Sequence, residues 1–450
     1  MRITWIQPED LIRHELWQSC AEGRDTESIS SRWRAAGGTT EIPHAGASPL
    51  SETSPSLRTL AEELLHELDA LPDPTAKDEP SDWADIHTLI AATPSSGHRP
   101  HDYSERLNSA WLGRAIGCVL GKPVEKIPRI GIEAILRSAG RWPLDRWITA
   151  VGVDPAVTER WPWNRASRTT SLEENINGTP EDDDINYTIM ALRVLENHGL
   201  SFTSDDVASG WLLDLPAGRS FTAERLAYRN LLQGLNPPAT ARVRNPFREW
   251  IGAQIRTDLY GWVMPGNPRG AAELAWRDAA VSHTRNGLYG AMFVAAMASE
   301  AITGSSIERV LDAGESVVPP TSRMARAISF GRHLAAHTTE PSDAFAEIER
   351  EFAGYHWVHA LNNTALVAYA LSAGAGDFDR SICLTVMGGL DTDSNGATVG
   401  SVVGALVGEQ GISPRWSKPL NGCVSTSLPG EHGVTFTCLA ERTEAVFSTQ

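Results

Sequence analysis

The sequence predicts an all-α protein, and three observations carry that prediction. Apolar residues recur with helical spacing beyond about residue 104, the segments that carry them are rich in alanine, and alternating strand-like runs with turn dipeptides are scarce. The clearest helical segments are residues 185–195, 271–279, 288–302 and 364–371. We therefore expect residues 101–450 to form one compact multi-helix bundle, the main domain of this 450-residue chain.

Residues 1–100 are expected to form a small helical region appended to this bundle. Two segments in it have helical periodicity, residues 9–23 and 57–71. The stretches between and after them are rich in Gly, Pro, Ser and Thr and are predicted to be flexible joints: residues 37–55, 72–80 and 93–100. Nothing in this region selects among partner recruitment, gating of a pocket and oligomerisation.

Composition excludes some classes of function. Asp and Glu total 56 against 39 Lys and Arg, so a nucleic-acid backbone is not an expected partner. The five cysteines lack metal-ligand spacing and no signal-peptide pattern opens the sequence, which favours a reduced, cytoplasmic setting. The longest apolar stretches are far shorter than the roughly 20 residues that cross a bilayer, so no membrane association is expected.

Residues 388–408, GGLDTDSNGATVGSVVGALVG, combine acids with a glycine-spaced helix. The beginning resembles a calcium-binding EF-hand loop, but that loop requires a bidentate Glu where this chain has Val402. The remaining interpretation is a glycine-rich turn that projects Asp391, Asp393 and Ser394 at a helix start, where free backbone N–H groups also attract anions. The alternative is an ordinary N-cap.

A second acidic cluster, residues 181–184, precedes the apolar helix predicted from Ile185 onward. Four adjacent acids repel one another, and a hard cation would relieve that repulsion far more than a helix dipole would. The alternative is a solvated acidic helix start. Two such clusters, each opening an apolar helix, favour a shared metal site.

Glycine spacing offers a way to bring these distant segments together. Glycines recur every fourth residue in residues 113–121 and again in residues 396–408, so each predicted helix has one face without side chains. Such faces allow close backbone approach. If the two helices pack antiparallel, Lys122, Pro123 and Glu125 lie at the same end of the bundle as the aspartates.

Four motifs together resemble the ADP-ribosylglycohydrolase family, over about residues 104–428. They are GRAIGCVLGKPVE from Gly113, EDDDINYT from Glu181, RNGLYGAM from Arg285 and GGLDTDSNGA from Gly388. They correspond, respectively, to the family's glycine-spaced P-x-E motif, its T-D-D metal motif, its G-N-G-A-M phosphate loop and its G-G-D-T-D-T motif. Their order along the chain makes the set specific.

The resemblance implies two divalent cations, Mg²⁺ or Mn²⁺, held by oxygen ligands. Asp391, Asp393 and Ser394 would take the places of one ligand set. In the first cluster, Glu181 would stand at the family's threonine and Asp182 and Asp183 at its two aspartates, with a register shifted by one residue as the alternative. An inserted leucine at position 390 and the serine at 394 depart from the family's pattern.

The resemblance also implies the chemistry. Paired metals hold the vicinal hydroxyls of a ribose and orient a water near the anomeric carbon, and cleavage needs a proton for the leaving group. Glu125 and Asp391 are the expected catalytic residues, with Glu125 as a mobile acid, base or water-positioning group. The alternative for Glu125 is a solvent contact at a helix end.

Substrate binding is expected at the phosphate loop and at the glycine pair of the last motif. Asn286 and Gly287 would bring donors to a pyrophosphate, with Arg285 as a charge partner. The full expected set is His283, Arg285, Asn286, Gly287, Tyr289, Gly388 and Gly389. A lone His such as His283 is more often structural, and His356 and His359 are interpreted as packing or pocket residues.

The predicted function is metal-dependent hydrolysis of the glycosidic bond between ADP-ribose and an acceptor, here a protein side chain. One alternative is hydrolysis of a small ribosylated or ADP-ribosylated metabolite. The other is a non-catalytic protein that binds ADP-ribose, which the altered metal motifs would explain.

Overall fold

Helices make up nearly all the regular structure of the computed structural model, which describes residues 3–42, 46–49, 53–90 and 97–448. The strands within those residues are β1 (Cys423–Val424) and β2 (Val434–Thr435), a two-residue antiparallel pair. The all-α prediction is confirmed. No helix in the described part of the chain has the length and apolar character needed to cross a membrane.

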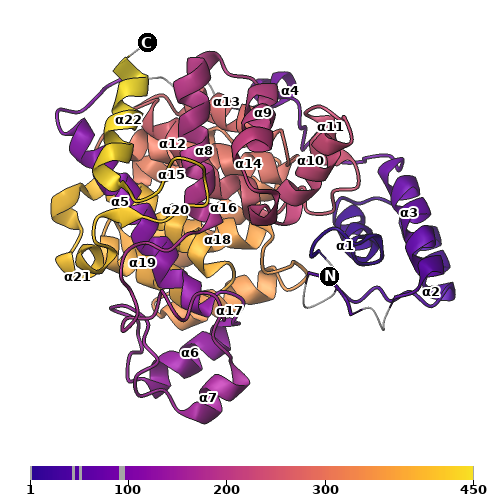
Figure 1. The fold of residues 1–450 in the computed structure, drawn as a ribbon, viewed down its shortest axis with the longest axis horizontal. Helices are drawn as coiled ribbons and strands as arrows, with labels where there is room; N and C mark the ends of the chain where they lie inside the picture. Colours follow the sequence, from indigo (N-terminus) through magenta and orange to yellow (C-terminus); the bar gives the residue numbers. More distant parts are fainter. Residues whose placement is uncertain (1–2, 43–45, 50–52, 91–96, 449–450) are drawn as a thin grey trace.

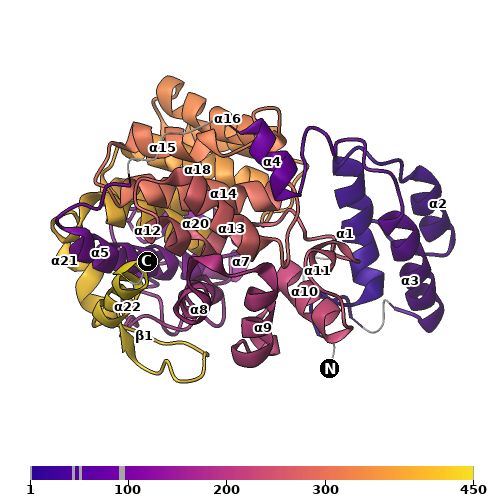
Figure 2. The same ribbon diagram turned by 90° about the horizontal axis from the view of Figure 1, so that it is seen from above.

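Before residue 100, the described part of the chain forms four α-helices. They are α1 (Pro8–Ala21), α2 (Glu27–Ala35), α3 (Pro55–Asp69) and α4 (Trp83–Leu89). In Figure 1 and Figure 2, α1 to α3 lie together at one end of the molecule, while α4 lies against the remaining helices. The two helices expected here from periodicity are confirmed as α1 and α3.

The remaining helices form the body of the molecule. In chain order they are α5 (Tyr103–Gly121), α6 (Arg129–Ser138), α7 (Pro155–Arg160), α8 (Asp183–His198), α9 (Ser204–Asp214), α10 (Thr222–Leu232), α11 (Ala239–Arg242), α12 (Asp258–Trp262), α13 (Pro268–Ala279), α14 (Asn286–Ala301), α15 (Ile307–Ser316), α16 (Arg323–His337), α17 (Pro341–Glu351), α18 (Ala360–Gly374), α19 (Phe378–Met387), α20 (Thr392–Val407), α21 (Pro414–Ser417) and α22 (Phe436–Ser448). The four segments singled out by periodicity lie in α8, α13, α14 and α18.

The main hydrophobic core lies around α14, every residue of which is buried. A second, smaller core joins the N-terminal helices to the body, because Leu11 of α1 and Leu64 of α3 share it with Phe247 and Trp250. The division at residue 100 into an appended region and a main domain therefore stays a prediction.

Residues 72–80 are more firmly placed than the expectation of a flexible joint implies. Asp73 and Glu79 from this stretch form ion pairs with Arg285 of the body, at 3.0 and 2.6 Å. Pro80 accepts a hydrogen bond from the Tyr289 hydroxyl. Of the other two expected joints, residues 43–45, 50–52 and 93–96 lie outside the described residues.

Candidate active site

Helices α5 and α20 pack antiparallel through their glycine faces. Gly113 lies against the carbonyl of Gly400, and Gly117 lies against that of Gly396, so residue numbers rise along one helix as they fall along the other. A Cβ atom on Gly117 would come within 1.8 Å of the Gly396 carbonyl oxygen. Only glycine permits this approach, which explains the four-residue spacing in the sequence.

The antiparallel pairing brings the end of α5 to the beginning of α20. The Thr392 hydroxyl donates a hydrogen bond to the Gly121 carbonyl oxygen, at 2.8 Å. Lys122 and Glu125, which follow Gly121, therefore lie at the same end of this helix pair as Asp391. The shared end of the bundle that the glycine spacing pointed to is present in the structure.

Three acids meet at this end of the bundle. Carboxylate oxygens of Glu125, Asp391 and Asp393 all lie within 4.8 Å of one another. Asn164 donates a hydrogen bond to Glu125 through its side-chain amide, at 2.5 Å, and the Asp391 backbone N–H donates to the Asn363 side-chain oxygen, at 3.2 Å. Both the carboxylate of Glu125 and the backbone turn at Asp391 are thus held in place.

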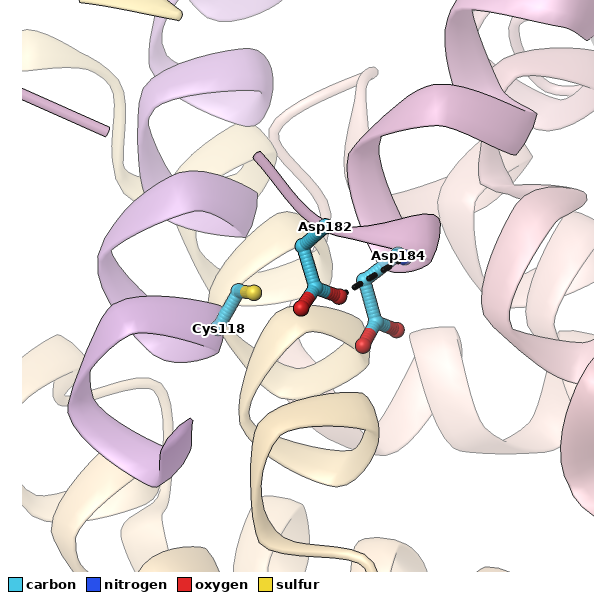
Figure 3. Close-up of side chains that lie close together, drawn as sticks. All are labelled: Cys118, Asp182 and Asp184. Carbon is cyan, nitrogen blue, oxygen red and sulfur yellow. Dashed lines mark hydrogen bonds between the residues drawn. The ribbon is translucent and has the colours of Figure 1, made fainter. Parts of the chain in front are cut away.

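The beginning of α8 supplies the second group of acids. Asp182 is the N-cap of α8, because its carboxylate accepts a hydrogen bond from the Asp184 backbone N–H at 2.9 Å. Figure 3 shows this contact, with the sulfur of Cys118 directed toward Asp182 from α5. The Lys122 ammonium forms an ion pair with Asp182 and lies 3.4 Å from the Glu181 carbonyl oxygen.

Asp184, rather than Glu181, links the two acidic groups. The Ser394 hydroxyl lies 3.3 Å from an oxygen of Asp184, whose other carboxylate oxygen is buried without a hydrogen-bond partner. The Glu181 carboxylate is instead held by the side chains of Asn186, at 2.8 Å, and Arg219, at 3.2 Å. The geometry favours the register in which Asp182 takes the capping place and Asp183 and Asp184 follow.

Burial and mutual repulsion dominate the electrostatics of these acids. Burial, followed by the charges of neighbouring acids, raises the pKa of Asp393 to about 7 and raises the pKa values of Asp391 and Asp184 well above their usual range. Burial alone would also raise the pKa of Asp182, but the charge of Lys122 lowers it. Acids with raised pKa values gain most from a nearby positive charge.

The donor set fits a hard divalent cation. The acids of α8 and α20, with the Ser394 hydroxyl, offer oxygen ligands, and one buried oxygen of Asp184 has no hydrogen-bond partner, with the Arg114 guanidinium 3.8 Å away as its cationic neighbour. Cys118 does not suit such an ion, because thiolates favour softer metals and burial raises the pKa of this thiol well above its ordinary value.

The acids line a cavity of about 300 Å³. Its other walls come from the segment that follows α5, from residues 164–167, from the beginning of α10 and the residues just before it, from residues near 251 and 357, and from the N-terminal region. The lining residues outside the acidic clusters include Trp5, Lys122, Lys126, Asn164, Arg219, Phe221, Glu224, Ile251 and Trp357. Trp5, from the N-terminal region, packs edge-on against Trp250 of the body. The cavity thus combines acids with aromatic surface.

The expected phosphate loop does not line this cavity. Arg285 is buried and paired with acids, and Asn286 donates hydrogen bonds from its side-chain amide to Glu79 and Glu249, both at 2.9 Å. Arg285 lines a different cavity, of about 450 Å³, between the N-terminal region and the body. Carboxylates therefore already occupy the donors that were expected to hold a pyrophosphate.

The other expected substrate-binding residues also lie outside the lining of the acidic cavity. His283 is buried, with its ring nitrogen 2.8 Å from the Ser282 hydroxyl, and Gly287 packs beneath the Arg248 carbonyl. Tyr289 is buried and bonded to Pro80, as described above. Gly388 packs against a leucine side chain, and Gly389, with φ +78°, lies against the backbone at residue 129.

A buried cluster of carboxylates in a helical fold, positioned by a pair of glycine-faced helices, is an arrangement suited to metal-assisted hydrolysis. The chain belongs to the ADP-ribosylglycohydrolase family, whose sequence model matches residues 99–449. Membership indicates a hydrolase activity of the ADP-ribosylglycohydrolase type, in a family that is generally metal-dependent.

One solved structure similar to this chain is described as an ADP-ribosylglycohydrolase-related protein complex. The two chains are 19% identical, with a TM-score of 0.43, and the match covers 77% of this chain and 96% of the other. No curated protein matches the sequence significantly.

Proposed function

We propose that this chain is a metal-dependent hydrolase that cleaves the glycosidic bond between a ribosyl group, such as that of ADP-ribose, and an acceptor. The convergence of Glu125, Asp391 and Asp393 within 4.8 Å in the wall of a cavity carries this proposal. Asp391 and Asp393 are buried and Glu125 is partly buried, and such a group of acids costs folding free energy without a cation, which indicates a functional site rather than a stabilising one.

The metal ligands in this proposal come from two helix starts. Asp391, Asp393 and Ser394 of α20 would hold a divalent cation on one side, and Asp183 and Asp184 of α8 face them from the other. When bound, Mg²⁺ or Mn²⁺ supplies a Lewis acid that binds hydroxyls and lowers the pKa of bound water.

The chain's own residues supply positioning and proton transfer. Glu125 is the proposed acid or base, since the Asn164 amide and the Lys126 ammonium, at 3.0 Å, fix its carboxylate beside the aspartates. It would take a proton from the attacking water at one carboxylate oxygen. Trp357 and Phe221 offer apolar walls to the rest of the substrate.

Two substitutions test the assignment with matched chemistry. Asp391→Asn removes one negative charge at the cation site and is expected to lower the hydrolysis rate by more than about 100-fold, and Glu125→Gln to lower kcat by about 100-fold or more. Asp205→Asn, an exposed acid of α9, is the control. Rates are measured on ADP-ribosylated protein and small ribosides. Full activity in Asp391→Asn with an unchanged melting temperature would refute the proposal.

A small ribosylated metabolite is the second candidate substrate. The observation that favours it is the burial of Arg285 and Asn286, whose donors are already paired with Glu79 and Glu249. In the same substrate panel, faster turnover of ribosides that lack a pyrophosphate would select this candidate. Binding of ADP-ribose without turnover of any substrate would instead identify a non-catalytic binding protein.

A further inference from the structure

The α8 side of the acidic site contains its own positive charges. Lys122 is buried and forms an ion pair with Asp182, and its ammonium also lies 3.4 Å from the Glu181 carbonyl oxygen. Arg114, which is fully buried in α5, lies 3.8 Å from a carboxylate oxygen of Asp184. Two of the three aspartates at the beginning of α8 therefore have a cationic side chain beside them.

The acids on the α20 side of the site have fewer cationic partners. Within the described residues no ion pair reaches Asp391 or Asp393. Glu125 has one cationic partner, Lys126, whose side chain is 58% exposed and consequently well screened by water. Among the described residues, neither aspartate of this group thus has a cationic side chain in direct contact, in contrast to Asp182.

The Lys122 ammonium binds Asp182, one of the acids expected from the sequence to hold metal. The Lys122 residue is held at its backbone and at the tip of its side chain. Its backbone directly follows Gly121, which packs tightly against Thr392, and its ammonium is bound to Asp182. A divalent cation that used Asp182 would have to displace the ammonium or share a carboxylate with it, and one that used Asp184 would lie beside the Arg114 guanidinium, which is 3.8 Å from that carboxylate. Two positive charges about 4 Å apart in a buried site repel strongly. The nearby Cys118 thiol offers no compensating oxygen ligand.

We propose that Lys122, with Arg114, takes the place of a second metal ion, so that the site binds a single divalent cation at Asp391, Asp393 and Ser394, with Glu125 beside it as the acid or base. This inference rests on the proposed metal dependence and changes the number of bound cations from two to one. Asp182 then serves as the N-cap of α8 and the counter-ion of Lys122, and Asp184 borders the single cation.

Counting bound metal tests the inference. The full chain, stripped with a chelator, is titrated with Mn²⁺ while free Mn²⁺ is followed by electron paramagnetic resonance, and the count is repeated calorimetrically with Mg²⁺. One equivalent per chain is expected. Lys122→Met keeps the length of the side chain but removes its charge, and it is expected to bind two equivalents. Lys418→Met is the control, from an exposed lysine that does not line the cavity, and should still bind one.

Each outcome bears on the inference. Two equivalents in the wild-type chain, or none, would overturn it, and one equivalent in a folded Lys122→Met chain would overturn the role of Lys122. Thermal unfolding establishes whether the variant is folded, and if it is not, the wild-type count decides, together with Lys122→Arg, which should bind one.

Hydrolysis, assayed separately, distinguishes this inference from the proposed function. One bound equivalent without turnover of any ribosyl substrate would refute the proposed activity and leave the single-cation inference standing. Two bound equivalents with metal-dependent turnover would refute the single-cation inference and leave the proposed activity standing.

Discussion

At the scale of single residues, the buried acids should leave a signature in how stability depends on pH. Asp393 has a pKa of about 7 in the folded chain, whereas an unfolded chain releases this proton near pH 4. Between these values the folded state holds more protons, so the free energy of unfolding falls as pH rises. The buried histidines His14 and His359 have lowered pKa values and therefore make the free energy of unfolding rise with pH. Their contribution cancels when a variant is compared with the wild type, because both chains contain them.

The corresponding prediction concerns Asp393→Asn in metal-free protein. Because the variant lacks the charge, it should be more stable than the wild type above pH 7, by on the order of 2 to 4 kcal/mol, and the two should converge toward pH 4. Denaturant unfolding at several pH values in the presence of a chelator measures this difference. Asp205→Asn should track the wild type throughout. A stability difference that does not vary with pH would contradict the assignment.

The individual residues of the site were predictable to different degrees. Asp391, Asp393 and Glu125 stand in motifs whose residue types carry the chemistry, and the structure brings them together. A run of four consecutive acids does not itself indicate which of them face the site. That is determined by the beginning of α8 at Asp183 and by the N-cap at Asp182. The pairing of Lys122 with Asp182 spans sixty positions and has no local pattern.

At the scale of elements, the contact between α5 and α20 positions the whole site. Gly117→Ala would place a methyl group 1.8 Å from the Gly396 carbonyl oxygen. Because the two groups belong to the backbones of packed helices, relieving this clash requires the helices to move apart. The expected loss in the free energy of unfolding is about 3 kcal/mol or more, accompanied by loss of metal binding.

The control at this scale is Gly354→Ala. An added Cβ there meets nothing within 4 Å and the backbone is not left-handed, so the change should be within about 0.5 kcal/mol. Chemical denaturation compares the two variants. Equal stabilities would show that the helices separate more easily than their contact implies.

Elements with a strong repeating pattern were the ones that the sequence revealed. The four-residue glycine spacing predicted both helices and the face along which they meet, because only glycine permits that approach. Helix α2, in contrast, has a polar sequence with few apolar positions, Ile29 and Trp33 among its buried residues, and periodicity did not reveal it. The two-residue strands are too short to show any alternation.

At the scale of the whole molecule, buried charge joins the N-terminal region to the body. Glu15 and Glu22 of the N-terminal region bind Arg248 at 2.7 and 2.8 Å, and Glu79 binds both Arg285 and Arg323. These pairs connect positions more than 200 residues apart. Sequence patterns report local structure, so neither this network nor the burial of the expected phosphate loop could be inferred from them.

Glu22→Gln tests how strongly this network holds the molecule together. Burial alone would raise the pKa of Glu22, but the charges of Arg248 and Arg285 lower it to about 2. The carboxylate therefore contributes stability above about pH 4.5 that is lost as pH falls toward 2. Removing its charge leaves a buried guanidinium undercompensated and should cost about 3 kcal/mol at pH 7.

The matched control for Glu22→Gln is Glu27→Gln, the same change a short distance along the chain. Glu27 is 76% exposed and paired with Arg34 at 2.9 Å, and exposed pairs contribute at most about 1 kcal/mol. Denaturant unfolding should show a large loss for the first variant that shrinks as pH is lowered, and a small loss for the second. If the N-terminal region docks through its apolar core alone, the two variants will be equally stable, because both leave Leu11, Leu64 and Phe247 in place.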